Sequence, residues 1–250
     1  MNSKNTSWGK VKEWYEEVLR DEDSYQAKVI LPNLLRAMSI KAGETVLDLA
    51  CGPGFFSHAF ANAGAKVIGV DISKELIAVA KEKNPNADFY VSSADSLRKI
   101  QDKSIDKVVV VLALQNIANV KGALEEAKRV LCSRGRLYLV LNHPVFRIPK
   151  RSSWGWDEAE KLQYRRIDSY LSESKEEIVM HPGALKSTTT TSFHRPLQYY
   201  FKLLGNAAFT TFRMEEWISH KKSESGPRQK AEDSARKEIP LFLFIEAVLI

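Results

Sequence analysis

Cysteine is scarce in this chain, and no apolar run is long. Cys51 and Cys132 are the only cysteines in 250 residues, and they show neither CxxC nor Cys/His ligand spacing. This argues against a disulfide framework, and we expect no metal site. The most apolar run, residues 241–250, is too short to span about 30 Å of hydrocarbon and contains Glu246, so we expect a buried terminal strand. The N-terminal segment lacks the apolar core of a signal peptide, and we expect a cytoplasmic protein without membrane association.

Two common nucleotide-binding signatures are missing as well. The phosphate-binding pattern GxxxxGK[ST] is absent, which argues against ATP at such a loop. The pattern Gly52-x-Gly54 has Ser57 where the dinucleotide motif GxGxxG has its third glycine. Asp48, just before this turn, would repel a pyrophosphate, so NAD is disfavoured.

The remaining composition is that of a folded globular protein. Hydrophobic residues make up 44% and charged residues 27% of the chain, which excludes disorder as the main state. The 37 Lys and Arg against 31 Asp and Glu give a net charge of +6, spread along the chain. This excess permits a nucleic-acid partner without arguing strongly for one.

Short apolar runs alternate with helical patterns along most of the chain. We expect strands at 46–50, 66–70, 88–91, 106–112 and 136–141, with helices at 55–62, 74–83, 95–100 and 120–131. Continuous Val/Ile/Leu strands separated by helices predict a doubly wound parallel sheet covered on both faces. Beyond it we expect a helix at 196–206, a strand at 209–214, a charged loop at 220–237 and a last strand at 241–249.

Two regions flank or interrupt this pattern. Residues 8–38 predict two helices, which we group as an N-terminal helical cap over 1–40. Residues 143–193 are rich in aromatics and polar strand patterns, and we interpret them as an inserted substrate lid. We expect a single domain over 1–250.

The segment VLDLACGPGFFS, residues 46–57, is the sharpest motif. It places a glycine turn at the carboxyl end of the first strand, where open α/β sheets bind ligands. Asp71 ends the second strand, where a carboxylate can accept both hydrogen bonds of a ribose diol, and Asp95 follows the third. Asp95 could equally cap a helix. Together the acids predict an adenosine site, and an acid near the turn suits a ligand that carries an ammonium and a sulfonium.

These segments resemble a known family. VLDLACGPGFFS looks like the first motif of class I S-adenosylmethionine-dependent methyltransferases, and VIGVDIS, SSAD and DKVVVVLALQNI resemble the next three. RVLCSRGRLYLVL is similar to the helix, turn and strand that follow, although members usually have Gly-Gly near Ser133-Arg134-Gly135. The closest resemblance is to the small-molecule group related to ubiquinone and menaquinone methyltransferases. It implies a Rossmann-like, seven-stranded mixed sheet that includes an antiparallel strand, and S-adenosylmethionine as the cofactor.

The resemblance also implies roles for particular residues. Asp48, Ala50, Gly52 and Gly54 would hold the methionine part, Asp71 and Ile72 the ribose and adenine, Ala94, Asp95 and Ser96 the adenine edge, and Ala113 would lie near the sulfonium. Members place an aromatic residue from the N-terminal helices over the cofactor. Tyr15 and Tyr25 are the candidates here, and either could equally belong to the core.

Methyl transfer to a hydroxyl or an ammonium requires a general base near the ends of the fourth and fifth strands. His143, directly after the fifth strand, is the best-placed titratable residue, although it could also simply pack beside Pro144. His194 is the second candidate. Ser192 or His194 could instead start the helix before Pro196.

Three functions remain open at this point. Methylation of a small molecule is the first, and methylation of tRNA or rRNA is the alternative, because aromatic and basic residues mix in the lid. A non-catalytic adenosine-ligand-binding protein is the third. DNA amino-methylation is disfavoured because Leu114-Gln115-Asn116-Ile117 stands where [DN]PP[YW] would be, and neither cysteine suits a cytosine C5 enzyme.

Overall fold

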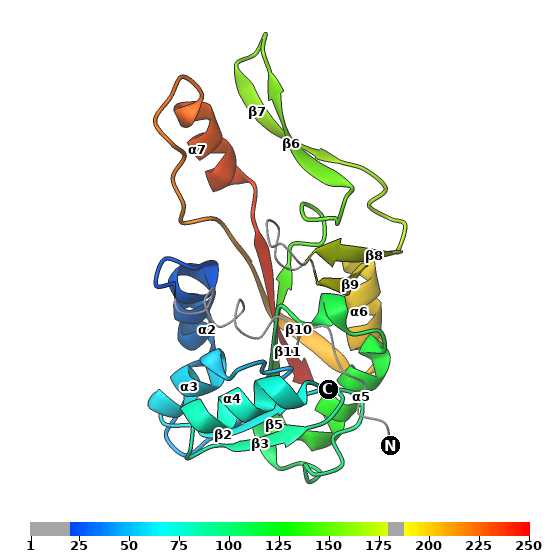
Figure 1. Cartoon of the computed structure of the whole chain (residues 1–250). Coiled ribbons are helices and arrows are strands. Elements are labelled where there is room, and N and C mark those ends of the chain that lie inside the picture. The colour runs from blue at the N-terminus through cyan, green and yellow to red at the C-terminus, as the bar shows by residue number, and fades with distance from the viewer. Residues whose placement is uncertain (1–20, 180–187) are drawn as a thin grey trace.

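A seven-stranded mixed sheet forms the centre of the protein. The computed structural model describes residues 21–179 and 188–250, and the strand order is β10-β11-β5-β4-β1-β2-β3 (Figure 1). β11 is antiparallel to both neighbours, while the pairs from β5 to β3 are parallel. The strands are β1 (Thr45–Leu49), β2 (Lys66–Asp71), β3 (Asp88–Val91), β4 (Ile105–Val111), β5 (Leu131–Asn142), β10 (Phe209–Trp217) and β11 (Phe242–Leu249). The predicted α/β class and the antiparallel strand are confirmed.

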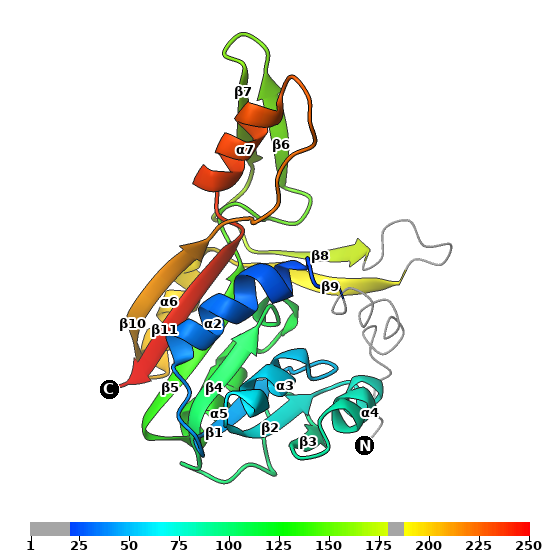
Figure 2. The same ribbon diagram turned by 90° about the vertical axis from the view of Figure 1, so that its left-hand side faces the viewer.

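Helices cover both faces of this sheet, as Figure 2 shows from the side. Alternate strand residues face opposite ways, so Val46 joins a core with α2 and α3 while Leu47 joins one with α5 and α6. Both residues are fully buried, which explains why the strands are apolar at successive positions. The helices are η2 (Gln26–Ile30), α2 (Leu31–Met38), α3 (Phe55–Asn62), α4 (Lys74–Lys83), α5 (Val120–Val130) and α6 (Leu197–Asn206).

The insertion after β5 forms two hairpins. β6 (Ser152–Asp157) pairs with β7 (Leu162–Ile167), and β8 (Ser174–Val179) pairs with β9 (Thr189–His194). The β6–β7 hairpin projects away from the sheet together with α7 (Gln229–Glu238), which packs against β7 (Figures 1 and 2). β9 instead contacts the short helix η3 (Leu114–Asn116) that follows β4, so the second hairpin borders the sheet edge.

Two local predictions are wrong. Residues 95–100 form turns rather than a helix, and the expected charged loop at 220–237 contains most of α7. α7 is almost entirely polar, with only Ala235 buried, so it lacks the apolar periodicity that identifies a helix. Of the two N-terminal helices, the second is present as η2 and α2, and the first lies outside the described residues. Within 21–179 and 188–250, no helix is long and apolar enough to cross a membrane.

Candidate functional site

A cavity of about 370 Å³ opens at the carboxyl ends of β1 to β4. Most of the residues predicted to bind a cofactor line it, namely Ala50, Gly52, Asp71, Ile72, Ala94, Asp95 and Ala113. Small side chains predominate among them, which leaves room for a ligand between the strand ends. In the sheet, β1 lies between β2 on one side and β4 on the other. The connections that follow these strands diverge at this point, and the opening lies where they diverge.

The backbone around this cavity is unusual at two strand ends. Ala50, after β1, has a φ of 62°, and Leu112, after β4, has a φ of 51°. Residues with a Cβ rarely adopt this left-handed conformation, which costs about 1–2 kcal/mol per residue. Such strain is concentrated at functional sites. At Ala50 and Leu112 this conformation changes the direction of the chain where β1 and β4 end, at the border of the cavity.

Asp71 is held in place by the backbone on both sides. Its Oδ2 accepts a hydrogen bond from the Gly52 N–H at 2.9 Å, and its Oδ1 accepts one from the Ser73 N–H at 2.8 Å. Burial raises the pKa of Asp71, while these hydrogen bonds act in the opposite direction. Each carboxylate oxygen keeps a further lone pair for a ligand. The predicted ribose carboxylate therefore faces the cavity in a fixed orientation.

Asp95 lines the same cavity and does not cap a helix. Its carboxylate accepts hydrogen bonds from the Ser93 hydroxyl and from Asn119 Nδ2, the latter at 2.8 Å, and the two bonds lower its pKa. Asn119 also caps α5 through Oδ1, which accepts from the Gly122 N–H at 3.0 Å. One asparagine thus ties the start of α5 to the cavity wall.

Asp48 lies behind the glycine turn and does not line the cavity. It is only 2% exposed, and its Oδ2 accepts a hydrogen bond from the Ser57 hydroxyl at 2.6 Å. Burial, together with the nearby charge of Asp71, raises the pKa of Asp48 to about 7, against the lowering effect of the Ser57 hydrogen bond. Asp48 therefore titrates near neutral pH.

Three other predicted residues also lie outside this cavity lining. Gly54 has a φ of 82° and begins α3, and a Cβ there would come within 2.7 Å of Asn84 Nδ2, so its role in the structure is to permit this turn. Ser96 follows the lining residues without joining them. The Tyr25 hydroxyl pairs with Ser219 Oγ at 3.2 Å, and its ring packs edge-on against Phe242. Tyr15 lies outside the described residues.

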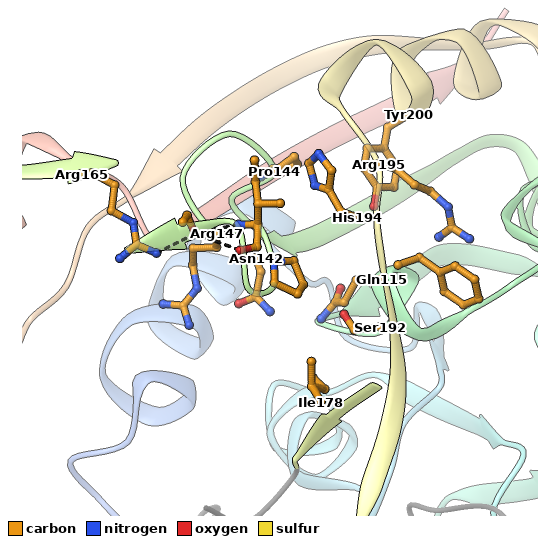
Figure 3. Close-up of a pocket in the computed structure, with 14 residues that line it drawn as sticks. Gln115, Asn142, Pro144, Arg147, Arg165, Ile178, Ser192, His194, Arg195 and Tyr200 are labelled. Atoms are coloured by element: carbon orange, nitrogen blue, oxygen red, sulfur yellow. Dashed lines mark hydrogen bonds between the residues drawn. The ribbon is translucent and has the colours of Figure 1, made fainter. Parts of the chain in front are cut away.

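Figure 3 shows the residues that line a second cavity, of about 260 Å³. Gln115 of η3 lines this cavity and its neighbour Asn116 lines the first, so η3 borders both. The remaining walls come from the end of β5, the segment that follows it, the two hairpins of the insertion, and Arg195 and Tyr200 beyond them. The lining therefore joins η3 to residues between 142 and 200, and the insertion forms part of it.

His194, on β9, lines the second cavity. Its Nε2 lies 2.7 Å from the Tyr170 carbonyl oxygen, and a carbonyl can only accept, so Nε2 carries the proton. In the neutral ring Nδ1 is then unprotonated, and it has no hydrogen-bond partner among the described residues. The helix that follows begins at Leu197 with Pro196 as its N-cap, so neither Ser192 nor His194 starts it.

His143 is placed differently. It is 1% exposed and lines neither cavity. Its Nδ1 accepts a hydrogen bond from the Val145 N–H at 3.3 Å, which leaves Nε2 to donate to Glu216 Oε1 at 2.7 Å. Burial lowers the pKa of His143, and the hydrogen bond that it donates to Glu216 raises this pKa by less. Because both ring nitrogens are engaged, the geometry favours a supporting role for His143 rather than the predicted catalytic one.

Arg195 joins the insertion to the edge of the first cavity. The side chain is buried, and its guanidinium donates to the carbonyl oxygens of Leu114 at 3.0 Å and Ile117 at 2.9 Å. It also donates to the carbonyl of Ala118 at 3.2 Å. Ile117 and Ala118 both line the first cavity. Arg195 therefore fixes the wall between the two cavities from the side of β9.

Comparison with known proteins agrees with this arrangement. A family model described as a methyltransferase domain matches residues 47–139, the segment from β1 to β5 that borders both cavities. The chain contains a class I S-adenosylmethionine-dependent methyltransferase domain. The predicted family and its cofactor, S-adenosylmethionine, are thereby confirmed.

Individual relatives support the same conclusion. A demethylmenaquinone methyltransferase of Paenarthrobacter aurescens is 38% identical over 110 residues, and a ubiquinone biosynthesis O-methyltransferase of Xanthomonas oryzae is 32% identical over 102. Each alignment covers 43% of the relative, with 44% and 39% of this chain, so the chain spans less than half the length of these curated relatives. A crystal structure of an S-adenosylmethionine-dependent methyltransferase from Mesorhizobium loti matches 86% of this chain and 95% of its own, with 26% identity and a TM-score of 0.68.

The first cavity fits S-adenosylmethionine chemically. Its lining supplies the carboxylates of Asp71 and Asp95, and Asn116 Oδ1 is a buried acceptor with no partner among the described residues. A buried acceptor without a donor is costly, so this set suits a cationic ligand rich in hydroxyl and amino donors. Sequence reasoning did not single out Asn116 and Asn119. Both residues follow the fourth predicted strand, and their position after the end of that strand could have identified them as candidates.

Proposed function

We propose that this methyltransferase transfers a methyl group from S-adenosylmethionine to a small-molecule acceptor in the second cavity. The observation that carries this proposal is that η3 borders both an acceptor-rich cavity and a separate second cavity at the same sheet edge. Enzymes accelerate displacement reactions by holding the two reactants in line in a site from which water is excluded. The two matched relatives that are named for quinone biosynthesis also support a small acceptor.

Asp71 and Asp95 would hold the cofactor, and Ala113 would lie near its reactive end. When bound, S-adenosylmethionine supplies an electrophilic methyl group on a sulfonium. Asp71 is oriented by two backbone N–H groups, which suits hydrogen bonds to a ribose diol. The assignments of Asp48, Gly54, Ser96 and Tyr25 to the cofactor have less support, because none of these residues lines the cavity.

His194 is the general base that the geometry favours. The Tyr170 carbonyl fixes its tautomer, so Nδ1 would accept a proton from a hydroxyl or ammonium acceptor. Gln115 provides a further hydrogen-bonding group for the acceptor in the same cavity. Its Nε2 donates to the Leu112 carbonyl at 2.6 Å, and its Oε1 is a buried acceptor without a partner among the described residues. A hydroxyl or N–H of a bound acceptor would satisfy it.

Methylation of RNA is less well supported by the insertion. Arg165 covers the ring of Trp154 with 5.2 Å between the guanidinium carbon and the ring centroid, and Arg228 covers Trp156 at 4.6 Å. Ring faces occupied by arginine are not free to stack on bases. Trp154 and Trp156 are therefore part of the packing of the arm that β6, β7 and α7 form.

Calorimetric titration with S-adenosylmethionine, S-adenosylhomocysteine and NAD tests the cofactor assignment. We expect affinity in the micromolar range, about −8 kcal/mol, for the first two and no binding of NAD. A screen of small phenols, amines and carboxylates with labelled methyl donor then tests turnover. Binding without turnover on any acceptor would favour a non-catalytic ligand-binding protein. RNA that is methylated, with an affinity that falls steeply as salt rises, would replace the small-molecule assignment.

The cytoplasmic location stays a prediction. Fractionation of cells that express the tagged protein tests it, and recovery of the protein with the membrane pellet would contradict it.

A further inference from the structure

The second cavity has an unusual electrostatic composition. Every ionisable side chain in its lining other than Tyr200 is basic, namely Arg147, Arg165, His194 and Arg195, and among the described residues no carboxylate lines it. Arg195 is already engaged with three carbonyl oxygens. The two arginines whose charge is available are Arg147, from the segment after β5, and Arg165, from β7.

Neither of these two arginines pairs with a carboxylate among the described residues. Arg147 has no hydrogen bond from its side chain and no ion pair among residues 21–179 and 188–250. Arg165 donates through Nε to the Phe146 carbonyl at 2.9 Å and through one terminal nitrogen to Ser152 Oγ at 2.9 Å, and both partners are uncharged. A guanidinium cannot lose its proton in proteins, so both charges persist.

The two guanidinium groups also act on each other. Figure 3 shows them on the same side of the cavity, with Arg195 on the other. Burial lowers the pKa of Arg165, and the charge of Arg147 lowers it further. The pKa of Arg147 is lowered as well, because the protein around the cavity shields its guanidinium from part of the solvent. The side chain as a whole is still exposed. Two like charges held together without a counter-ion are costly, and a bound anion would offset that cost.

The rest of the lining combines apolar side chains with the polar side chains of Gln115, Asn142, Ser152 and Ser192. Ile148, Ile178, Phe193 and Pro144 contribute to the walls, so the cavity also offers burial to a hydrophobic body. A free inorganic anion would leave these side chains uncovered. An organic molecule with an anionic end and an apolar remainder would use both kinds of surface.

We propose that the methyl acceptor carries an anionic oxygen group on an apolar body, and that Arg147 and Arg165 bind that group. Its assignment as the acceptor rests on the proposed function, but the anion site itself does not. Arg147 and Arg165 determine specificity in this scheme, and η3 directs the other end of the acceptor toward the first cavity.

The experiment compares benzoate with its neutral isostere benzamide, using ligand-observed NMR titration of the full chain. We expect benzoate to bind at least about tenfold more tightly, because a charge-assisted hydrogen bond contributes about 1.5–3 kcal/mol. Arg147→Gln should lower benzoate affinity roughly tenfold or more, and benzamide affinity much less. Arg166→Gln is the matched control, because Arg166 neighbours Arg165 on β7 but is exposed and pairs with Asp168 at 2.8 Å.

Titration with S-adenosylhomocysteine accompanies each variant. Unchanged affinity for it shows that Arg147→Gln folds and keeps the first cavity, and Arg147→Lys, which keeps the charge, should restore part of the benzoate binding. Equal affinity for benzoate and benzamide, absence of benzoate binding, or equal effects of Arg147→Gln and Arg166→Gln would overturn the proposal. Loss of S-adenosylhomocysteine binding in the wild type would instead count against the proposed function, since benzoate binding is measured without the cofactor.

Discussion

Replacing Asp48 by asparagine removes a buried carboxylate while keeping its shape. The pKa of Asp48 rises from an ordinary value of 3.8 to about 7 in the folded protein, with burial as the main cause. A tenfold change in proton affinity corresponds to about 1.4 kcal/mol, so ionised Asp48 destabilises the fold by up to about 4 kcal/mol. Asparagine carries no charge and can still hydrogen-bond to Ser57. We expect Asp48→Asn to raise the free energy of unfolding by about 2–4 kcal/mol at pH 8.

The sign of the pH dependence follows from the same shift. Because the folded state holds the Asp48 proton more tightly than the unfolded state, stability from this group is lost as pH rises from about 4 to about 7. Asp48→Asn should therefore gain little at about pH 4 and most of its advantage by about pH 8. His143, whose pKa is lowered, acts in the opposite direction below its ordinary value of 6.5. Comparing variant with wild type at each pH cancels that contribution.

Urea unfolding followed by tryptophan fluorescence at several pH values measures this difference. Asp88→Asn is the control, because Asp88 is an exposed residue at the start of β3 and its replacement should leave the pH profile unchanged. A constant difference between Asp48→Asn and wild type across the range would refute the reasoning. A cation bound near Asp48 would also lower its pKa, so titration with S-adenosylmethionine near pH 7 in buffers of different ionisation enthalpy should detect proton release that Asp48→Asn lacks.

Three further predictions concern the two cavities. Asp71→Ala should weaken S-adenosylhomocysteine binding by about 1–3 kcal/mol in calorimetry, through loss of charge-assisted ribose hydrogen bonds, and unchanged affinity would remove Asp71 from the site. His194→Ala should lower turnover roughly a hundredfold on an oxygen or nitrogen acceptor without changing cofactor affinity, whereas His143→Ala should mainly lower the melting temperature. The reverse pattern of kinetics and melting would restore His143 as the base. Arg195→Met should weaken cofactor binding several-fold and lower stability by about 1–3 kcal/mol, because it removes the hydrogen bonds that a buried guanidinium donates to three carbonyl oxygens at the cavity wall. A calorimetric titration that matched wild type would show that this wall needs no such support.

The adenosine side of the site was predictable because it depends on local order along the chain. A glycine turn after β1 and acids after β2 and β3 fall at one sheet edge in any parallel sheet of this connectivity. Asp71 and Asp95 therefore reach the same cavity, as predicted. Sequence spacing did not show that Asp48 points behind the turn to Ser57, because a side chain's direction depends on which sheet face its neighbours cover.

The choice between His143 and His194 illustrates the other limit. Both are nearly completely buried histidines beside the same sheet edge, and the sequence ranked His143 first. Each histidine donates through Nε2 to a partner far away in sequence, His143 to Glu216 on β10 and His194 to the Tyr170 carbonyl. They differ at Nδ1, which accepts from the Val145 N–H in His143 and has no partner among the described residues in His194. Only His194 lines a cavity, and that depends on contacts between distant segments that no local pattern predicts.

The sequence by itself determined the alternating strands and helices, the glycine turn and the carboxylates of the cofactor side, because hydrophobic period and turn chemistry act between near neighbours. Only the tertiary structure decided the second cavity, the proposed acceptor site. This cavity brings Gln115, Arg147, Arg165 and His194 together from four separate segments. Contacts between such distant segments depend on how the hairpins close over the sheet. The lack of a carboxylate partner for Arg147 and Arg165 among the described residues depends on the same long-range contacts.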